Sequence, residues 1–236
     1  MSATLGAAHR HFHNQLSDLK AKLLTMSGEA QDALGHALDA LLKRDADLAA
    51  RVIAGDHAVD ALELEIEETV IDLLATQQPM ARDLRLLVAA TKIANDLERV
   101  GDHAVNIAQS AERLLAARVI APEPELLEMA RQARAMLSGA LDAFVRGDAG
   151  LGREICRRDD SVDALHHSVF RILLTHMMED PHIIGAAMDL FLVSRNLERV
   201  ADLATNIAED VVFVSEGKTI KHHAEDGFPE PEATPQ

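Results

Sequence analysis

Hydrophobic residues recur every three or four positions along most of the chain, which is the period of an amphipathic α-helix. Residues 12–44 give an example, in which Leu16, Leu19 and Leu23 begin a series of this kind. Runs of β-branched and aromatic residues, which are typical of strands, are scarce by comparison. The pattern therefore predicts an all-α fold.

Turn-forming residues interrupt the helical pattern at several places and divide it into six long helices. K-R-D at 43–45 ends the first helix, and Asp45 is suited to cap the second. Q-Q-P at 77–79 and E-D-P at 179–181 end the second and fifth helices, because proline cannot continue a helix. The predicted helices cover residues 12–44, 47–76, 80–117, 126–144, the stretch after 146–150 that contains Asp159 and Asp163, and 182–214.

The two ends of the chain lack this periodicity. Residues 1–10 are small and polar, and we expect them to be loose. Residues 217–236 contain Pro229, Pro231 and Pro235 and few apolar side chains, so we expect a disordered tail there.

The chain contains an internal repeat. Residues 95–108 and 196–210 share the pattern L-E-R-V-x-D-x-A-x-N-I-A, which indicates two copies of a unit of roughly 100 residues. A-P-E-P at 121–124 separates the copies, so we predict two tandem three-helix bundles, at 10–118 and 124–216. Whether the bundles pack end to end or side by side stays open. The matched polar residues are Glu98 with Glu198, Asp102 with Asp202, and Asn106 with Asn206.

Each copy also carries two pairs of carboxylates spaced four residues apart. Residues at this spacing lie on one face of a helix, where like charges repel unless something positive lies over them. An arginine, a partner protein or a metal ion could supply that charge. If the two helices of a copy are antiparallel, the pairs meet, as in the carboxylate metal sites of helical bundles. The pairs are Asp56 with Asp60 and Glu98 with Asp102, and then Asp159 with Asp163 and Glu198 with Asp202.

Composition narrows the range of functions. The net charge of −16 argues against a general affinity for nucleic acid, and the 3% aromatic content argues against stacking on single strands. The single Cys156 excludes an internal disulfide and fits a reducing compartment. Neither a signal peptide nor an apolar run long enough for a membrane span is apparent, so we expect a cytoplasmic protein.

Four segments together make the chain resemble the PhoU family of phosphate-system regulatory proteins over residues 10–223. They are P-M-A-R-D-L-R-L at 79–86, N-D-L-E-R-V-G-D-H-A-V-N-I-A at 95–108, N-L-E-R-V-A-D-L-A-T-N-I-A-E at 196–209, and E-G-K-T-I-K-H at 216–222. The resemblance implies two similar three-helix bundles and a non-enzymatic role in phosphate homeostasis. It also implies negative regulation of phosphate uptake and of the starvation response, through the ATPase subunit of the phosphate ABC transporter and a sensor histidine kinase. Members of the family are often homodimers.

The resemblance further implies metal binding. Some members bind multinuclear iron or zinc clusters through E/D-x-x-x-D pairs, and others bind different metals or none. Oxygen ligands alone also suit Mg²⁺, Mn²⁺ or Ca²⁺. Leu203 departs from the family pattern, since a histidine often follows the aspartate there, as His103 does in the first copy. Carried over to this chain, the ligands would be Asp56, Asp60, Glu98 and Asp102 at one site, and Asp159, Asp163, Glu198 and Asp202 at the other.

Other interpretations compete with metal binding. Arg99 and Arg199 directly follow the glutamates and could neutralise the carboxylates by salt bridging in a purely structural bundle. A carboxylate-bridged metalloenzyme is the other alternative, but such bundles usually supply a Glu-x-x-His motif, and neither L-E-R-V-G-D-H-A nor L-E-R-V-A-D-L-A contains one. Among the histidines, His166 lacks a partner at helical spacing, and we expect it to be solvated.

Overall fold

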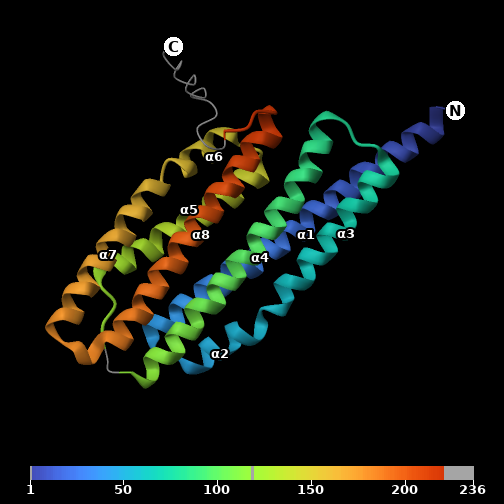
Figure 1. Cartoon of the computed structure of the whole chain (residues 1–236). Coiled ribbons are helices and arrows are strands. Elements are labelled where there is room, and N and C mark those ends of the chain that lie inside the picture. The colour runs from blue at the N-terminus through green and yellow to red at the C-terminus, as the bar shows by residue number, and fades with distance from the viewer. Residues whose placement is uncertain (1, 118–119, 221–236) are drawn as a thin grey trace, which may run out of the picture.

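Helices make up nearly all of the computed structural model, which describes residues 2–117 and 120–220, with side chains from residue 11 onward (Figure 1). No strand occurs in these two ranges, so the all-α prediction is confirmed. The helices are α1 (Ser2–Lys43), α2 (Ala46–Gly55), α3 (His57–Gln77), α4 (Ala81–Ala116), α5 (Pro124–Arg146), α6 (Ala149–Cys156), α7 (Asp159–Glu179), the short 3₁₀ helix η1 (Pro181–Ile183) and α8 (Ile184–Glu216).

The two predicted three-helix bundles are present, but the middle helix of each is broken. The expected helix at 47–76 is α2 followed by α3, which meet at Asp56. The expected fifth helix is likewise α6 followed by α7. Gly55 weakens the helix before the first break, and Asp159 and Asp160 favour a new helix N-terminus after the second. Each break lets both pieces pack on the same neighbour, with α2 and α3 on α4, and α6 and α7 on α8.

The predictions for the chain ends need one correction. Helix α1 begins at Ser2, so the expectation of a loose segment at 1–10 was wrong for the described part of it. Residues 217–220 follow α8 without regular structure, and the rest of the predicted disordered tail lies outside the described residues.

Local signals in the sequence explain where several helices begin and end. The side chain of Asp45 accepts a hydrogen bond from the Leu48 backbone N–H at 2.9 Å, which confirms the predicted cap of α2. Asp148 caps α6 in the same way through Leu151, at 3.0 Å. Helix α5 ends just before Gly147, whose φ of 64° is a conformation that glycine adopts without strain.

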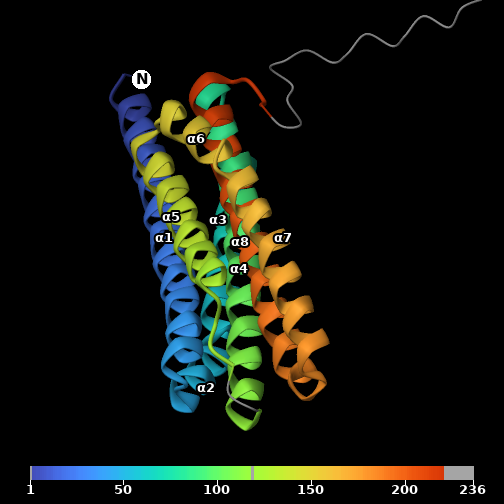
Figure 2. The ribbon, with the colours of Figure 1, turned by 90° about the vertical axis from the view of Figure 1, so that its left-hand side faces the viewer.

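The bundles pack side by side, with α4 and α8 antiparallel at the centre (Figure 1). The start of α4 meets the end of α8, because Lys92 lies 3.5 Å from Asp210. The end of α4 meets the start of α8, because Arg113 lies 2.6 Å from Asp189. Helices α7, α8, α4 and α3 follow one another across Figure 1, and α1 and α5 form a second layer seen side by side in Figure 2.

The core is aliphatic and runs along the α4–α8 contact. Leu97 and Val100 on α4 are fully buried, as are the equivalent Leu197 and Val200 on α8. A Cβ atom at Gly152 would lie 2.9 Å from the Ala208 carbonyl oxygen, so α6 approaches the backbone of α8 closely. No helix within residues 2–117 and 120–220 combines the length and the apolar character that crossing a membrane requires.

Candidate functional site

The packing of α3 on α4 brings together four carboxylates, which we call the first acidic cluster. Asp56 lies at the junction of α2 and α3, Asp60 lies one turn into α3, and Glu98 and Asp102 lie on α4. A Cβ atom at Gly101 would lie 3.5 Å from the Asp56 Oδ1, so the glycine lets the Asp56 carboxylate lie against α4. Glu98 and Asp56 are half-buried, while Asp60 and Asp102 are exposed. The cluster therefore opens to solvent on one side.

Burial and mutual repulsion raise the pKa values of two carboxylates in the first acidic cluster, Glu98 and Asp56. Burial raises the pKa of Glu98 to about 7, and the charges of Asp102 and Glu63 add to that shift. The pKa of Asp56 is raised by burial and then by Asp60 and Asp102. The neighbouring negative charges thus make Glu98 and Asp56 harder to ionise, which is the electrostatic condition that a bound cation relieves.

The second acidic cluster consists of Asp159 and Asp163 on α7 with Glu198 and Asp202 on α8. Burial raises the pKa of Asp159 to about 6, and the charges of Asp202 and Asp163 add to the shift. The pKa of Asp202 is also raised, by burial and by Glu198, although Arg199 opposes this. A contact with the Thr205 side chain on α8 opposes the shift in the pKa of Asp159, whose Oδ1 atom is buried.

Each cluster has a further neighbour that the sequence analysis missed, seven residues after its first aspartate. In the first copy this residue is Glu63, which accepts a hydrogen bond from the Asn95 amide at 3.3 Å. In the second copy it is His166, which is half-buried and lies 3.1 Å from the Ser194 hydroxyl through Nδ1. Burial lowers the pKa of His166, while the charges of Glu198 and Asp163 favour its protonated form. The expectation that His166 is solvated was wrong.

Arg99 and Arg199, which follow the glutamates of the two acidic clusters, form different ion pairs in the two copies. Arg199 donates a hydrogen bond from Nη1 to Asp202 Oδ2 at 2.9 Å, so salt bridging partly neutralises the second acidic cluster. Arg99 instead pairs with Asp96, which lies 3.8 Å away and is not part of the first acidic cluster. Simple salt bridging therefore accounts for one copy of the repeated acidic motif and not for the other.

The side chains of both clusters are of the type that binds cations, but they are not yet arranged around a common metal position. Carboxylate oxygens are ligands for hard divalent ions, and each cluster carries four carboxylates on two helices that pack together. In the described part of the chain, however, no three His, Cys, Asp or Glu side chains already surround one metal position. A cation would therefore draw these side chains inward by rotation about their side-chain bonds.

The raised pKa of Glu98 leads to a prediction about stability and pH. The group is neutral in both states below its ordinary pKa of 4.5, and ionised in both states above about 7. Its contribution to the free energy of unfolding should therefore fall as pH rises through this range. Glu98→Gln should abolish this decrease in the free energy of unfolding. The decrease itself should be less than about 1 kcal/mol, because solvent screens the side chain.

Denaturant unfolding in metal-free buffer between pH 4 and 8 measures this effect. Glu112→Gln provides the control, since it makes the same charge change on an exposed side of the same helix. Identical pH dependence in Glu98→Gln and the wild-type protein would contradict the assignment.

Four further residues that the sequence analysis named lie outside the two clusters. His103 contacts Asn196 on α8, with 2.9 Å between Nδ1 and Oδ1, and so bridges the two bundles. Asn106 and Asn206 line separate cavities beside the α4–α8 contact. Cys156 is half-buried, and burial raises the pKa of its thiol to about 11, which makes it an inert packing residue.

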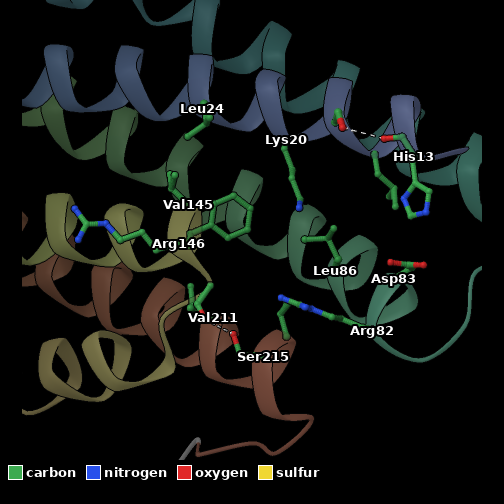
Figure 3. Close-up of a pocket in the computed structure, with 15 residues that line it drawn as sticks. His13, Lys20, Leu24, Arg82, Asp83, Leu86, Val145, Arg146, Val211 and Ser215 are labelled. Atoms are coloured by element: carbon green, nitrogen blue, oxygen red, sulfur yellow. Dashed lines mark hydrogen bonds between the residues drawn. The ribbon is translucent and has the colours of Figure 1, made fainter. Parts of the chain in front are cut away.

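A separate cavity of about 390 Å³ lies between α1, α4, α5 and α8, where α4 begins and α8 ends (Figure 3). Lys20 and Arg82 extend into it from α1 and α4, whereas Arg146 points away. None of the eight carboxylates of the two acidic clusters lines this cavity. It is therefore distinct from the candidate cation sites.

Comparison with known proteins assigns the family. The model of the PhoU domain matches the chain twice, at residues 23–111 and 126–211. The chain belongs to the PhoU family. The two PhoU matches fall one in each repeat, and each includes two of the four acidic pairs.

Curated PhoU relatives cover most of the chain. The phosphate-specific transport system accessory protein PhoU homolog of Zymomonas mobilis is 37% identical over 217 residues, 92% of each chain. The homolog of Caulobacter vibrioides is 39% identical over 212 residues, 89% of this chain and 92% of its own. These names describe an accessory protein of phosphate transport and not an enzyme.

Two solved PhoU structures share the fold. The crystal structure of PhoU from Pseudomonas aeruginosa is 36% identical and superposes with a TM-score of 0.85, over 88% of this chain and 100% of that one. The phosphate transport system regulatory protein PhoU from Streptococcus pneumoniae is 28% identical, with a TM-score of 0.82 over 88% of this chain and 98% of that one. The tandem arrangement is therefore the PhoU fold.

Proposed function

We propose that this chain is a non-enzymatic regulator of phosphate uptake and of the phosphate-starvation response. Its main support is the double match to the PhoU domain, together with relatives named as accessory proteins of phosphate-specific transport. The chain acts in this proposal as an adaptor in the cytoplasm, between the ATPase subunit of the phosphate ABC transporter and a sensor histidine kinase. When phosphate is plentiful, it restrains uptake and keeps starvation genes off.

The surface of the protein supports an adaptor role. Long helices expose extended faces, and the net charge of −16 favours contact with basic patches on partner proteins. Several large apolar side chains are also exposed, including Leu64 and Ile71 on α3 and Met178 on α7. Exposed apolar groups of this kind are compatible with a second copy of the chain, and we propose that the protein works as a homodimer.

Deletion of the gene should leave phosphate-starvation genes expressed in phosphate-rich medium, because the negative regulator is missing. A reporter fused to a starvation-induced promoter measures this directly. Expression of the intact chain from a plasmid should restore repression and serves as the control. Normal repression in the deletion strain would refute the proposed function.

We also propose that each acidic cluster binds divalent metal, with the eight predicted carboxylates as ligands. The first acidic cluster offers only oxygen donors and is suited to Mg²⁺, Mn²⁺ or Ca²⁺, while the nearby His166 makes the second better suited to zinc or iron. A bound ion supplies positive charge. The residues themselves would clamp α3 to α4 and α7 to α8, and Arg199 would have to leave Asp202.

A further inference from the structure

A groove of about 410 Å³ runs along the contact between α4 and α8, and one of its lining residues, Arg199, also binds Asp202 of the second acidic cluster. Four arginines line it: Arg99 and Arg113 from α4, and Arg195 and Arg199 from α8. Its other lining side chains are amides, a hydroxyl, an imidazole and one leucine, so no carboxylate belongs to the lining. Such a concentration of positive charge is unexpected in a chain with a net charge of −16.

The ion pairs of these arginines leave donors available to the groove. Arg113 binds Asp189 through Nε at 2.6 Å and the Ser110 hydroxyl through Nη2 at 2.9 Å. Arg99 and Arg199 are half exposed and pair with carboxylates outside the groove lining. Arg195 is exposed and forms no hydrogen bond or ion pair with any residue in the described ranges.

The internal duplication provides a comparison within the same molecule. Helices α4 and α8 occupy equivalent positions in the two repeats and run antiparallel. The opposite end of their contact is therefore built from the positions that correspond, in the other repeat, to those lining the groove. There the place of Ser110 is taken by Asp210, which Lys92 approaches to 3.5 Å. The place of Arg113 is taken by Phe213, whose ring centroid lies 5.7 Å from the Lys92 ammonium nitrogen.

The two ends have therefore diverged in chemistry. At one end, Asp210 and the Phe213 ring both interact with Lys92. At the other end, the equivalent positions carry the Ser110 hydroxyl and the Arg113 guanidinium, which are hydrogen-bond donors. Packing alone gives no reason for this difference, since equivalent helices meet at both ends. Recognition of a negatively charged ligand at one end explains it.

We infer that the α4–α8 groove binds a phosphate group. Guanidinium forks match the oxygens of a tetrahedral anion in pairs, and Gln109 and Asn196 add neutral donors beside them. The groove is open to solvent, so binding should weaken as salt increases. The inference deepens the proposed function and rests on it for its regulatory meaning. The phosphate could be free inorganic phosphate or the terminal group of a nucleotide, which share the same chemistry.

Calorimetric titration of the full-length protein tests the inference, with inorganic phosphate and ADP as separate ligands at constant ionic strength. Prior treatment with a chelator excludes phosphate held by bound metal. We expect saturable binding of at least one of the two ligands, and the tighter one identifies the source. Arg195→Gln should weaken that binding by at least about tenfold, because it removes a charged donor whose bonds are worth more than neutral ones.

Arg51→Gln is the matched control, since it makes the same charge change at an exposed position of α2 outside the groove. It should bind like the wild-type protein. Arg195→Lys should recover only part of the affinity, since lysine keeps the charge and loses the fork.

Absence of binding by both ligands up to about 10 mM would overturn the inference. So would an equal loss in Arg51→Gln and Arg195→Gln, because binding would then reflect overall charge. Neither result bears on repression in the deletion strain, so the failure of this inference and the failure of the proposed function are distinguishable.

Discussion

Asp102→Ala combined with Asp202→Ala should strip most bound divalent metal from the protein while leaving its helix content unchanged. Each of these aspartates interacts with carboxylates on the facing helix, as shown by its effect on the pKa of Asp56 or Asp159. Loss of one ligand from each proposed site should lower metal affinity by at least about tenfold. Neither side chain belongs to the buried core, so circular dichroism should stay the same.

Elemental analysis of protein purified without a metal-binding tag measures the loss. The control is Asp39→Ala combined with Asp142→Ala, which removes the same charge from the same two repeats. Both control residues form exposed ion pairs with a lysine or arginine one turn away, far from the acidic clusters in sequence. Unchanged metal content in the Asp102 and Asp202 variant would remove these residues from the proposed sites.

Leu97→Ala should lower the free energy of unfolding by about 2–5 kcal/mol, because it leaves a cavity in a core that cannot close over it. Leu97 is fully buried on α4, the helix that packs against α1, α3 and α8. Leu42→Ala is the control, since Leu42 is 50% exposed on α1 and its loss should change stability by less than about 0.5 kcal/mol.

Urea unfolding followed by circular dichroism compares the two variants with the wild-type protein. The midpoint for Leu97→Ala should fall well below the midpoint for Leu42→Ala, at a similar slope. Equal midpoints would mean that the α4–α8 contact is not the centre of the stable core.

Most of the fold could be predicted from the sequence because its signals are local. Helical periodicity, the Asp45 cap and the proline-containing turns each depend on a few neighbouring residues. The repeat then indicated two equivalent bundles. The breaks at Asp56 and before Asp159 were missed, since the apolar series of Val52, Val59 and Leu62 continues across the first of them. The side-by-side packing of the bundles was also beyond reach, because it depends on contacts between the copies.

For the candidate sites too, the sequence predicted the local features and missed those that depend on packing between helices. Spacing along one helix predicted each acidic pair, and packing of α3 on α4 and of α7 on α8 joined the pairs. Glu63 and His166 were missed because neither has a counterpart of the same type in the other copy. The groove was missed because Arg113 and Arg195 come from different repeats and meet only through the antiparallel α4–α8 contact.

A crystal structure of the protein equilibrated with Mn²⁺, with anomalous diffraction data, tests the central claim most directly. The proposed sites predict manganese peaks between α3 and α4 and between α7 and α8, with carboxylate oxygens at about 2.0–2.6 Å. Asp102 and Asp202 should be among the ligands. Carboxylates left in their present positions, with no peak between either pair of helices, would contradict the claim that the duplicated acidic motif binds cations.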